Sequence, residues 1–356
     1  MTIEWLAGNR LRGTTAELPV SGLAAGSVGG WVEVGRTTLG SAGDTIDVSS
    51  LADKRYYMVL VDGISSGSID FQQRFGSGGT VDTGSNYSRR QSVNGAADGT
   101  SVNRSNIDSS IDGSVNQFMV SYIANLSGKE KLVQDQIVEG GASGSGTAPE
   151  RSETVGKWVN TSNPIDVMRL YNTQAGSYNT NSEVVVLGWD DSDSHTTNFW
   201  EELADVSLSS TNTSLDSGTF TAKKYLWVQM YQKGMTGNNT LYNFNSDTGS
   251  NYARRWKIDG GTEFTTGSTT GLMCHNAVGT QTDNFFNMFI VNNSANEKLV
   301  ISHSAYTIST GAGSAPSREE HVGKWANTSS QITSIQFDHG GSNFGIGSSI
   351  KVWGSN

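Results

Sequence analysis

The hydrophobic residues of this chain fall into short runs and alternating positions, separated by polar or glycine-rich segments. Runs of about four to eight residues with a two-residue period are typical of strands that line a β-sandwich core. No segment carries an apolar stripe of helical period for more than about two turns. The pattern therefore predicts an all-β chain. The clearest predicted strands are Tyr56–Val61, Asn116–Ile123, Leu132–Val138, Val167–Tyr171, Leu226–Tyr231, Phe285–Val291, Ile335–Phe337 and Val352–Trp353.

Turn-forming dipeptides stand between these predicted strands. Asn-Gly, Asp-Gly and Gly-Gly pairs favour tight turns, because their backbones readily adopt positive φ angles. Their spacing predicts short antiparallel strands. The turns predicted in this way are Asp62-Gly63, Asn94-Gly95, Asp112-Gly113, Asp259-Gly260 and Gly340-Gly341.

An internal repeat is the strongest feature of the sequence. Four groups of segments in the first half recur in the same order in the second, at a nearly constant separation. The longest match joins Asp82–Arg90 (DTGSNYSRR) to Asp247–Arg255 (DTGSNYARR), with one difference. The other matches are Trp31-Val32-Glu33 with Trp200-Glu201-Glu202, Lys54-Arg55-Tyr56 with Lys223-Lys224-Tyr225, Glu130–Val133 with Glu297–Val300, Ala148-Pro149 with Ala315-Pro316, Gly156-Lys157-Trp158 with Gly323-Lys324-Trp325, and Glu183–Gly188 with Ser349–Gly354.

The repeat predicts two tandem antiparallel β-sandwiches of jelly-roll-like type. A chain of 356 residues is long enough for two domains of about 150 residues, each with its own core. We place an extended N-terminal arm at residues 1–30, the first sandwich at 31–188, a polar linker at 189–199 and the second sandwich at 200–356.

Composition and charge narrow the function classes. Only 16% of the residues are charged, Gly reaches 43, and the formal net charge is -10. An acidic protein repels polyphosphate, so we expect no nucleic-acid partner. The single cysteine, Cys274, excludes an intrachain disulfide. The first residues, Met1–Arg12, lack the features of a signal peptide, and no apolar run approaches a membrane span, so we expect a soluble protein made in a cytoplasm.

The Asp-Thr-Gly-Ser motif occurs once in each half, at Asp82 and Asp247. A two-lobed aspartic peptidase also takes one such aspartate from each lobe, and the two carboxylates share a proton. Both motifs here have the flanks of polar loops, however, and not those of buried apolar strands. The structural interpretation, in which the aspartates form turns, therefore explains more of the motif.

The sequence gives little support for a metal site or for a catalytic nucleophile. The acidic run Asp190, Asp191 and Asp193 lacks the glycine and terminal glutamate of a helix-flanked calcium loop, so a solvated linker is favoured. Cys274 is better explained as a small buried hydrophobe than as the partner of the adjacent His275. The five histidines show no metal-ligand spacing, and we interpret them as polar surface or loop positions. They are His195, His275, His303, His321 and His339.

Two further features of the sequence are its glycine-rich segments and its repeated aromatic residues. The segments 140–146 and 311–314 lack the lysine and the helix of a phosphate loop, and we interpret them as loop tips. Trp158 and Trp325 occupy equivalent positions, as do Tyr87 and Tyr252, and we favour a core role over a sugar site for the tryptophans. The sequence therefore identifies no catalytic, cofactor-binding or metal-binding residue, and we expect a protein that is not an enzyme.

Several motifs resemble structural proteins of tailed bacteriophages, particularly marine ones. They are the opening Ala7–Thr15 (AGNRLRGTT), the Asp-Thr-Gly-Ser-Asn-Tyr loops, and the Ala-Pro and Gly-Lys-Trp-x-Asn-Thr-Ser stretches of each copy. The resemblance covers nearly the whole chain. It implies jelly-roll or lectin-like sandwiches displayed on a virion, as capsid decoration, fibre or tail appendage. It supplies no catalytic residues.

The leading hypothesis is a non-enzymatic virion structural protein that assembles through its N-terminal arm and sandwich surfaces. Its expected partners are other capsid or tail proteins and further copies of itself, with neither nucleic acid nor membrane. The alternative is an adhesin or receptor-binding module that binds a host surface glycan through aromatic and amide side chains. An enzyme, either the peptidase or a glycoside hydrolase with a carboxylate pair, ranks third.

Overall fold

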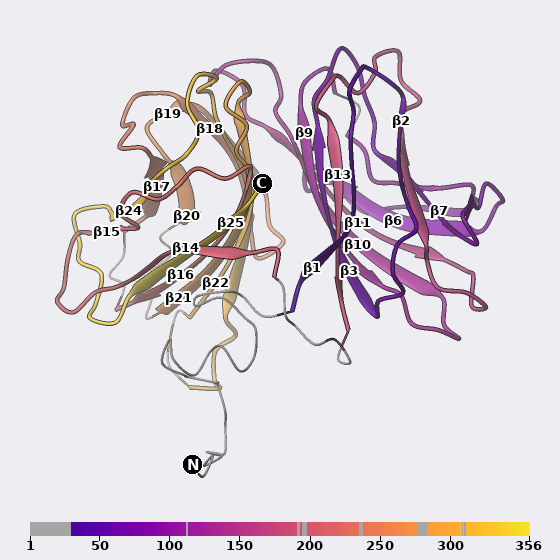
Figure 1. Ribbon diagram of the computed structural model, residues 1–356. Helices are drawn as coiled ribbons and strands as arrows, with labels where there is room; N and C mark the ends of the chain where they lie inside the picture. The colour runs from indigo at the N-terminus through magenta and orange to yellow at the C-terminus, as the bar shows by residue number, and fades with distance from the viewer. Residues whose placement is uncertain are drawn as a thin grey trace, which may run out of the picture.

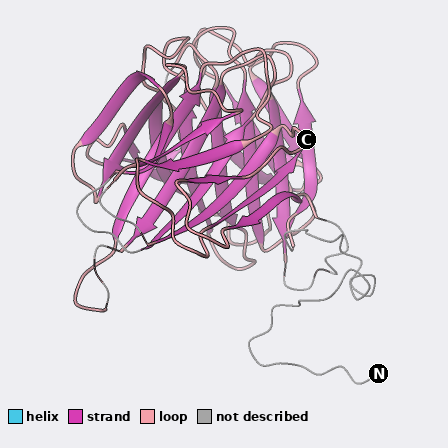
Figure 2. Cartoon of the chain, turned by 90° about the vertical axis from the view of Figure 1, so that its left-hand side faces the viewer, coloured by secondary structure: helices cyan, strands magenta, loops and turns pink. Residues whose placement is uncertain are grey.

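The chain folds into two β-sandwiches that lie side by side (Figure 1). Figure 2 shows the described residues as strands and loops. The computed structural model describes residues 30–111, 113–190, 193, 198–234, 238–276, 283–307, 309 and 311–356. In these residues the strands β1 to β25 form antiparallel pairs, and there is no helix. The predicted all-β class with two tandem antiparallel sandwiches is confirmed.

The first sandwich pairs a large sheet with a smaller one. The large sheet has the order β1-β13-β3-β9-β10-β11-β6-β7; the small sheet has the order β2-β12-β4-β5, with β8 added to β4. The bounds are β1 (Val32–Thr38), β2 (Thr45–Ser49), β3 (Tyr56–Gly63), β4 (Gln72–Ser77), β5 (Thr80–Val81), β6 (Tyr87–Val93), β7 (Gly99–Arg104), β8 (Ile107–Asp108), β9 (Gln117–Ala124), β10 (Lys131–Glu139), β11 (Glu150–Trp158), β12 (Val167–Tyr171) and β13 (Glu183–Trp189).

The second sandwich repeats this topology, except that its described strands include no counterpart of β5. Its large sheet has the order β14-β25-β16-β21-β22-β23-β18-β19, and its small sheet the order β15-β24-β17-β20. The bounds are β14 (Glu201–Ser207), β15 (Ser214–Asp216), β16 (Tyr225–Lys233), β17 (Thr240–Phe244), β18 (Tyr252–Ile258), β19 (Glu263–Thr269), β20 (Leu272–His275), β21 (Asp283–Val291), β22 (Lys298–Tyr306), β23 (Ser317–Trp325), β24 (Ile335–His339) and β25 (Ser349–Ser355).

Each large sheet is buried on both faces over much of its area, which explains the apolar runs in its central strands. In β3, Tyr57, Val59 and Val61 face the core between the two sheets of the first sandwich. Met58 and Leu60 alternate with them and belong to a separate apolar cluster between the sandwiches. Because successive side chains of a strand point to opposite faces, β3 contributes residues to both clusters.

The contact between the sandwiches is apolar at its centre and polar at its margin. Leu60 and Val120 of the first sandwich join Phe289 and Ile301 of the second in one buried cluster. At one margin, the Tyr225 hydroxyl donates to the Glu183 carboxylate over 2.9 Å. Burial of this kind favours a fixed arrangement of two domains over free movement on a linker.

A lysine in each copy of the Glu-Lys-Leu-Val motif closes a loop. Lys131 Nζ donates to the backbone oxygens of Leu126, Lys129 and Asn160. The equivalent Lys298 Nζ donates to those of Ser294, Asn296 and Asn327. Both lysines are fully buried. The motif recurs because three carbonyls need one cationic donor in each sandwich.

The structure confirms three of the predicted turns and contradicts one. Asn94-Gly95 and Asp259-Gly260 have positive φ angles and join strands, as predicted. Gly340-Gly341 also has positive φ angles, directly after β24. The prediction for Asp62-Gly63 is wrong, because both residues belong to β3; the Asp62 carboxylate is buried and pairs with Lys224 at 3.1 Å. Asp112 lies outside the described residues.

The predicted arm and linker lie largely outside the described residues. Residues 1–29, which make up nearly all of the predicted arm, lie outside the described residues, and so do 191–192 and 194–197 of the predicted linker. Trp189, placed at the start of the linker by the sequence, is the last residue of β13. Across the described ranges no helix is long and apolar enough to cross a membrane.

Candidate functional site

The two Asp-Thr-Gly-Ser motifs form equivalent turns. The Asp82 carboxylate accepts hydrogen bonds from the Gly84 amide (2.8 Å), the Asn86 side chain (2.9 Å) and Trp158 Nε1 (2.8 Å). Partial burial acts against ionisation of Asp82, but these three donors outweigh it and lower its pKa. An ionised, fully engaged carboxylate is a turn former, as the structural interpretation predicted.

Asp247 repeats this arrangement in the second sandwich. It accepts from Gly249, Asn251 and Trp325 Nε1, the last at 2.7 Å, and the pKa of Asp247 is likewise lowered. Because each aspartate bonds within its own sandwich, the two do not share a proton. The structure thus argues against the arrangement on which the peptidase hypothesis rests.

The repeated aromatic residues are core residues. Trp158 and Trp325 are each 1% exposed, and Tyr87 and Tyr252 are fully buried. Each tyrosine ring stacks on the tryptophan of its own sandwich, with centroids 6.4 Å and 6.3 Å apart. The core role predicted for the tryptophans is confirmed. These four rings are therefore not part of a surface site.

The interpretation of the histidines as surface or loop residues is wrong for most of them. His275, His321 and His339 are buried within β20, β23 and β24 of the second sandwich. Burial, and to a lesser degree His339, lowers the pKa of His275 to about 3, so its imidazole is neutral and packs beside the Tyr306 ring. His303 lies in β22 at the sandwich interface, and His195 lies outside the described residues.

The remaining candidates also have structural roles. Cys274 is fully buried in the second core, as predicted, and burial raises the pKa of its thiol well above the usual range. Asp193 pairs with Lys54, whereas Asp191 lies outside the described residues. Within the described ranges, no three His, Cys, Asp or Glu side chains are arranged to hold a metal ion.

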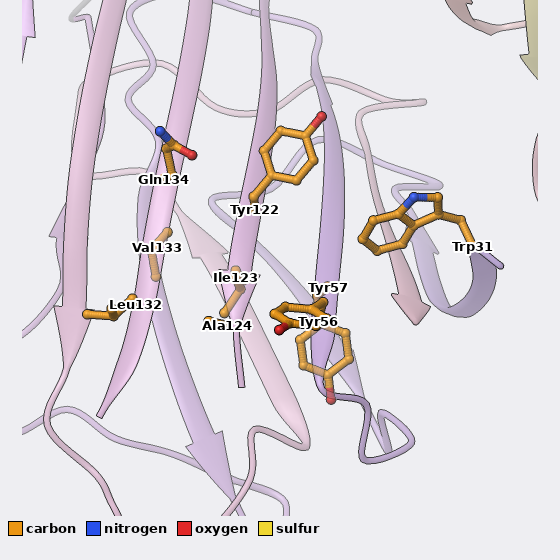
Figure 3. Close-up of a pocket in the computed structure, with 9 residues that line it drawn as sticks. All are labelled: Trp31, Tyr56, Tyr57, Tyr122, Ile123, Ala124, Leu132, Val133 and Gln134. Atoms are coloured by element: carbon orange, nitrogen blue, oxygen red, sulfur yellow. The ribbon is translucent and has the colours of Figure 1, made fainter. Parts of the chain in front are cut away.

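A groove on the outer face of the first large sheet is a candidate site (Figure 3). It encloses about 320 Å³. In Figure 3 the Tyr122 ring from β9 lies between Gln134 on β10 and the Trp31 indole, which precedes β1. The lining residues are Trp31, Tyr56, Tyr57, Tyr122, Ile123, Ala124, Leu132, Val133 and Gln134.

Four polar groups of this groove have no hydrogen-bond partner in the described part of the chain. They are Trp31 Nε1, the hydroxyls of Tyr56 and Tyr122, and the Gln134 amide, all on partly or fully exposed side chains. Leu132 adds an aliphatic surface that is 57% exposed. Aromatic faces beside free hydroxyl and amide groups form a surface that can bind a ligand with both apolar and hydroxyl faces.

The second sandwich has the positions equivalent to Tyr122 and Gln134 in buried surroundings. Strand register pairs Tyr122 with Gln134, and in the second sandwich it pairs Phe289 with Ile301 at the corresponding place. Phe289 is 3% exposed and packs against Trp200 and Trp227 of its own sandwich, and Ile301 is 2% exposed in the apolar cluster between the sandwiches. The covered pair is apolar, whereas the open pair carries a hydroxyl and an amide.

A second hollow adjoins the groove and lies between the two sandwiches. It encloses about 420 Å³ and shares Gln134 with the groove. Its charged lining residues are largely paired: Arg90 with Asp98 at 3.3 Å, and Arg318 with Glu320. The lining consists of Arg90, Ser92, Asp98, Gln134, Asp135, Gln136, Glu153, Thr154, Val155, His303, Arg318 and Glu320.

Sequence reasoning missed this groove because it weighed the aromatic residues that are identical in both copies. Identity between copies selected Trp158 and Trp325, which both sandwiches need for their cores. The useful signal was a difference: Phe289 and Ile301 of the second copy are replaced by Tyr122 and Gln134 in the first. A polar change at matched strand positions indicates a face that remains in water.

Comparison with known proteins gives little further information. No family model matches the chain, and no curated protein matches it. Among solved structures, domains LG4-5 of the mouse laminin alpha1 chain align over 92% of each chain at 10% identity, with a TM-score of 0.20. A Pseudomonas aeruginosa FadL homologue aligns over 86% of this chain and 91% of its own at 9% identity, with a TM-score of 0.09. TM-scores this low do not establish a shared fold.

Proposed function

We propose that this chain is a non-enzymatic binding protein that contacts a glycan through the groove of Trp31, Tyr56, Tyr122 and Gln134. One observation carries the proposal: the open face has Tyr122 and Gln134 where the covered face has Phe289 and Ile301. A sugar presents C–H groups on its ring faces and hydroxyls at its edges. Tyrosine and tryptophan rings bind the first, and amide and phenol groups bind the second.

An exposed apolar contact for another protein is the competing explanation for such a groove. A permanent protein interface favours apolar residues at its centre, as the covered face of the second sandwich shows with Phe289, Ile301 and Val291. The open face instead has Ala124 and the polar Gln134 in two of the equivalent places. This difference favours a hydroxyl-bearing ligand.

Placement on a bacteriophage particle is the second part of the proposal. The resemblance of the repeated motifs to phage structural proteins supports it, together with the use of those motifs. Lys131 closes a loop, Asp82 fixes a turn and Trp158 fills a core. Motifs that serve rigidity in both copies suit a protein that displays a surface, as a particle component does.

Glycan binding is tested with the full chain on a glycan array, beside the variant Tyr122→Ala. We expect binding to at least one glycan class and a loss of about tenfold or more on removal of the ring. Phe285→Ala is the matched control, because Phe285 is 45% exposed on the second sandwich and lines neither hollow. Equal losses in both variants, or no binding at all, would contradict the proposal.

The particle role has its own test. Purified particles from the source of the gene are analysed by mass spectrometry, and an antibody to the folded chain is applied in electron microscopy. We expect the chain at a fixed copy number per particle and the antibody at a regular position. Recovery of the chain only in the soluble fraction would refute the particle role without affecting the glycan groove.

A further inference from the structure

We infer that the ligand is an uncharged oligosaccharide of several rings, which runs from the aromatic groove into the adjoining hollow between the sandwiches. This inference rests on the proposed function and adds the class of glycan. It follows from two features of the site: the lining residue Gln134, which the two hollows share, and the charges that line the second hollow.

The length of the ligand follows from the extent of the two hollows, which share Gln134. One sugar ring stacks on one aromatic side chain, whereas the groove offers Trp31, Tyr56 and Tyr122. Beyond Gln134 the second hollow continues with the side chains of Gln136 and Ser92. The two hollows enclose about 320 Å³ and about 420 Å³, within the range of sites that bury most of a ligand. A chain of rings fits this path better than a single sugar.

The charge of the ligand follows from the second hollow. Asp98, Glu153 and Glu320 line it, against the arginines Arg90 and Arg318. Each arginine already pairs with a carboxylate of the same hollow, so neither offers its full charge to a ligand. Glu153 and Glu320 are likewise paired, with Arg151, so a sulfated or uronic sugar would gain little from the charges of this lining in a protein of net charge -10. An uncharged sugar does not depend on these charges.

Gln134 is the residue that joins the two parts of the path. It lines both hollows, and its amide has no partner in the described ranges of the chain. An amide can donate to one hydroxyl and accept from another, which suits two consecutive rings of one glycan. Removing it should weaken long ligands more than short ones.

The test is isothermal titration calorimetry on the full chain with neutral oligosaccharides from one to six rings, and with sulfated oligomers of the same backbones. The backbones are gluco-, manno-, galacto- and xylo-configured. We expect the affinity to rise about tenfold or more from one ring to four, and to fall on sulfation. A preference for sulfated oligomers, or equal affinity for one and four rings, would overturn the inference while leaving the glycan function intact.

A variant separates the second hollow from the first. Ser92→Tyr narrows the second hollow and leaves the aromatic groove unchanged, since Ser92 lines only the former. It should remove the gain in affinity from long oligomers and keep the affinity for two rings. Unchanged binding of six rings would overturn the extended path. A chain that binds none of these glycans, charged or uncharged, would end the proposed function as well.

Discussion

The outer faces of the two large sheets carry corresponding residues in different surroundings. Phe289 and Ile301 of the second sandwich lie in the apolar cluster between the sandwiches, at 3% and 2% exposure. Tyr122 and Gln134 occupy the same ladder positions in the first sandwich and line an open groove. The outer faces of both large sheets thus associate at residues such as Leu60 and Ile301, while the end of the first face around Tyr122 and Gln134 stays open.

The comparison shows how a repeat can separate stability from function. Residues that are identical in both copies, such as Asp82 and Trp158, serve turns and cores. Residues that differ at matched positions, such as Phe289 and Tyr122, reflect what surrounds each one, which is buried protein in the second copy and an open groove in the first. Arg151 and Arg318 are an exception, since the same residue in both copies lies in different surroundings, with side chains 5% and 64% exposed.

The largest effect is expected from Arg151→Ala, which breaks the interface between the sandwiches. Arg151 bonds Glu153 (2.5 Å), Glu263 (2.8 Å) and Glu320 (3.2 Å), and its removal takes this partner from all three carboxylates, of which Glu320 keeps Arg318. We expect a loss of about 3–5 kcal/mol in the free energy of unfolding. Denaturant titration measures it.

Arg318→Ala is the matched control for this change, because Arg318 is the equivalent residue of the second copy and is largely exposed. We expect it to change the unfolding free energy by less than about 1 kcal/mol. Equal losses from the two variants would show that the interface is not organised around Arg151.

Acid should weaken the second sandwich in particular. Burial lowers the pKa of His275 to about 3, so the folded state binds fewer protons than the unfolded state between that value and the ordinary pKa of about 6.5. Its contribution to stability is complete above about pH 6.5 and decreases as the pH falls, by about 3 kcal/mol at pH 4. His275→Asn should reduce this decrease. Hydrogen exchange resolved by strand measures it, and identical acid profiles for wild type and variant would contradict it.

The first sandwich should respond to pH in the opposite sense through Asp135. Burial raises the pKa of Asp135 to about 6, although Ser109, Ser121 and Gln73 act against this. The folded state therefore holds a proton that the unfolded carboxyl, with a pKa near 3.9, has lost, so stability falls as the pH rises between these values. Asp135→Asn should add about 1–3 kcal/mol at pH 8 and nothing at pH 3. Thermal unfolding at both pH values tests this, and a loss at pH 8 would refute it.

The smallest effect on stability is expected from converting the open face into the covered one. Tyr122→Phe with Gln134→Ile copies Phe289 and Ile301, and the partly exposed positions should change the unfolding free energy by less than about 1 kcal/mol. Glycan binding should nevertheless fall and self-association should rise, because the new face is apolar. Sedimentation velocity and calorimetry measure the two effects. Unchanged binding would show that these two polar groups are not contacts.

The sequence predicts the fold better than the site because repetition exposes what both copies need. The period of Tyr56–Val61 and the turn at Asn94-Gly95 follow from local chemistry, and both are found. The burial of Asp62 and His275 does not follow, because it depends on surfaces that pack only in the folded chain. The open position of Tyr122 can be read from the sequence only by comparing the two copies, where Tyr122 and Gln134 stand against Phe289 and Ile301.

The most direct test of the glycan groove is the indole signal of Trp31 in nuclear magnetic resonance spectra of the full chain labelled at tryptophan. Trp31→Phe identifies the signal, and the buried Trp158 serves as the internal reference. On addition of a neutral tetrasaccharide of the class bound on the array, the Trp31 signal should shift in a saturable way while the Trp158 signal stays constant. A saturable shift elsewhere with Trp31 unmoved would contradict the assignment of the groove.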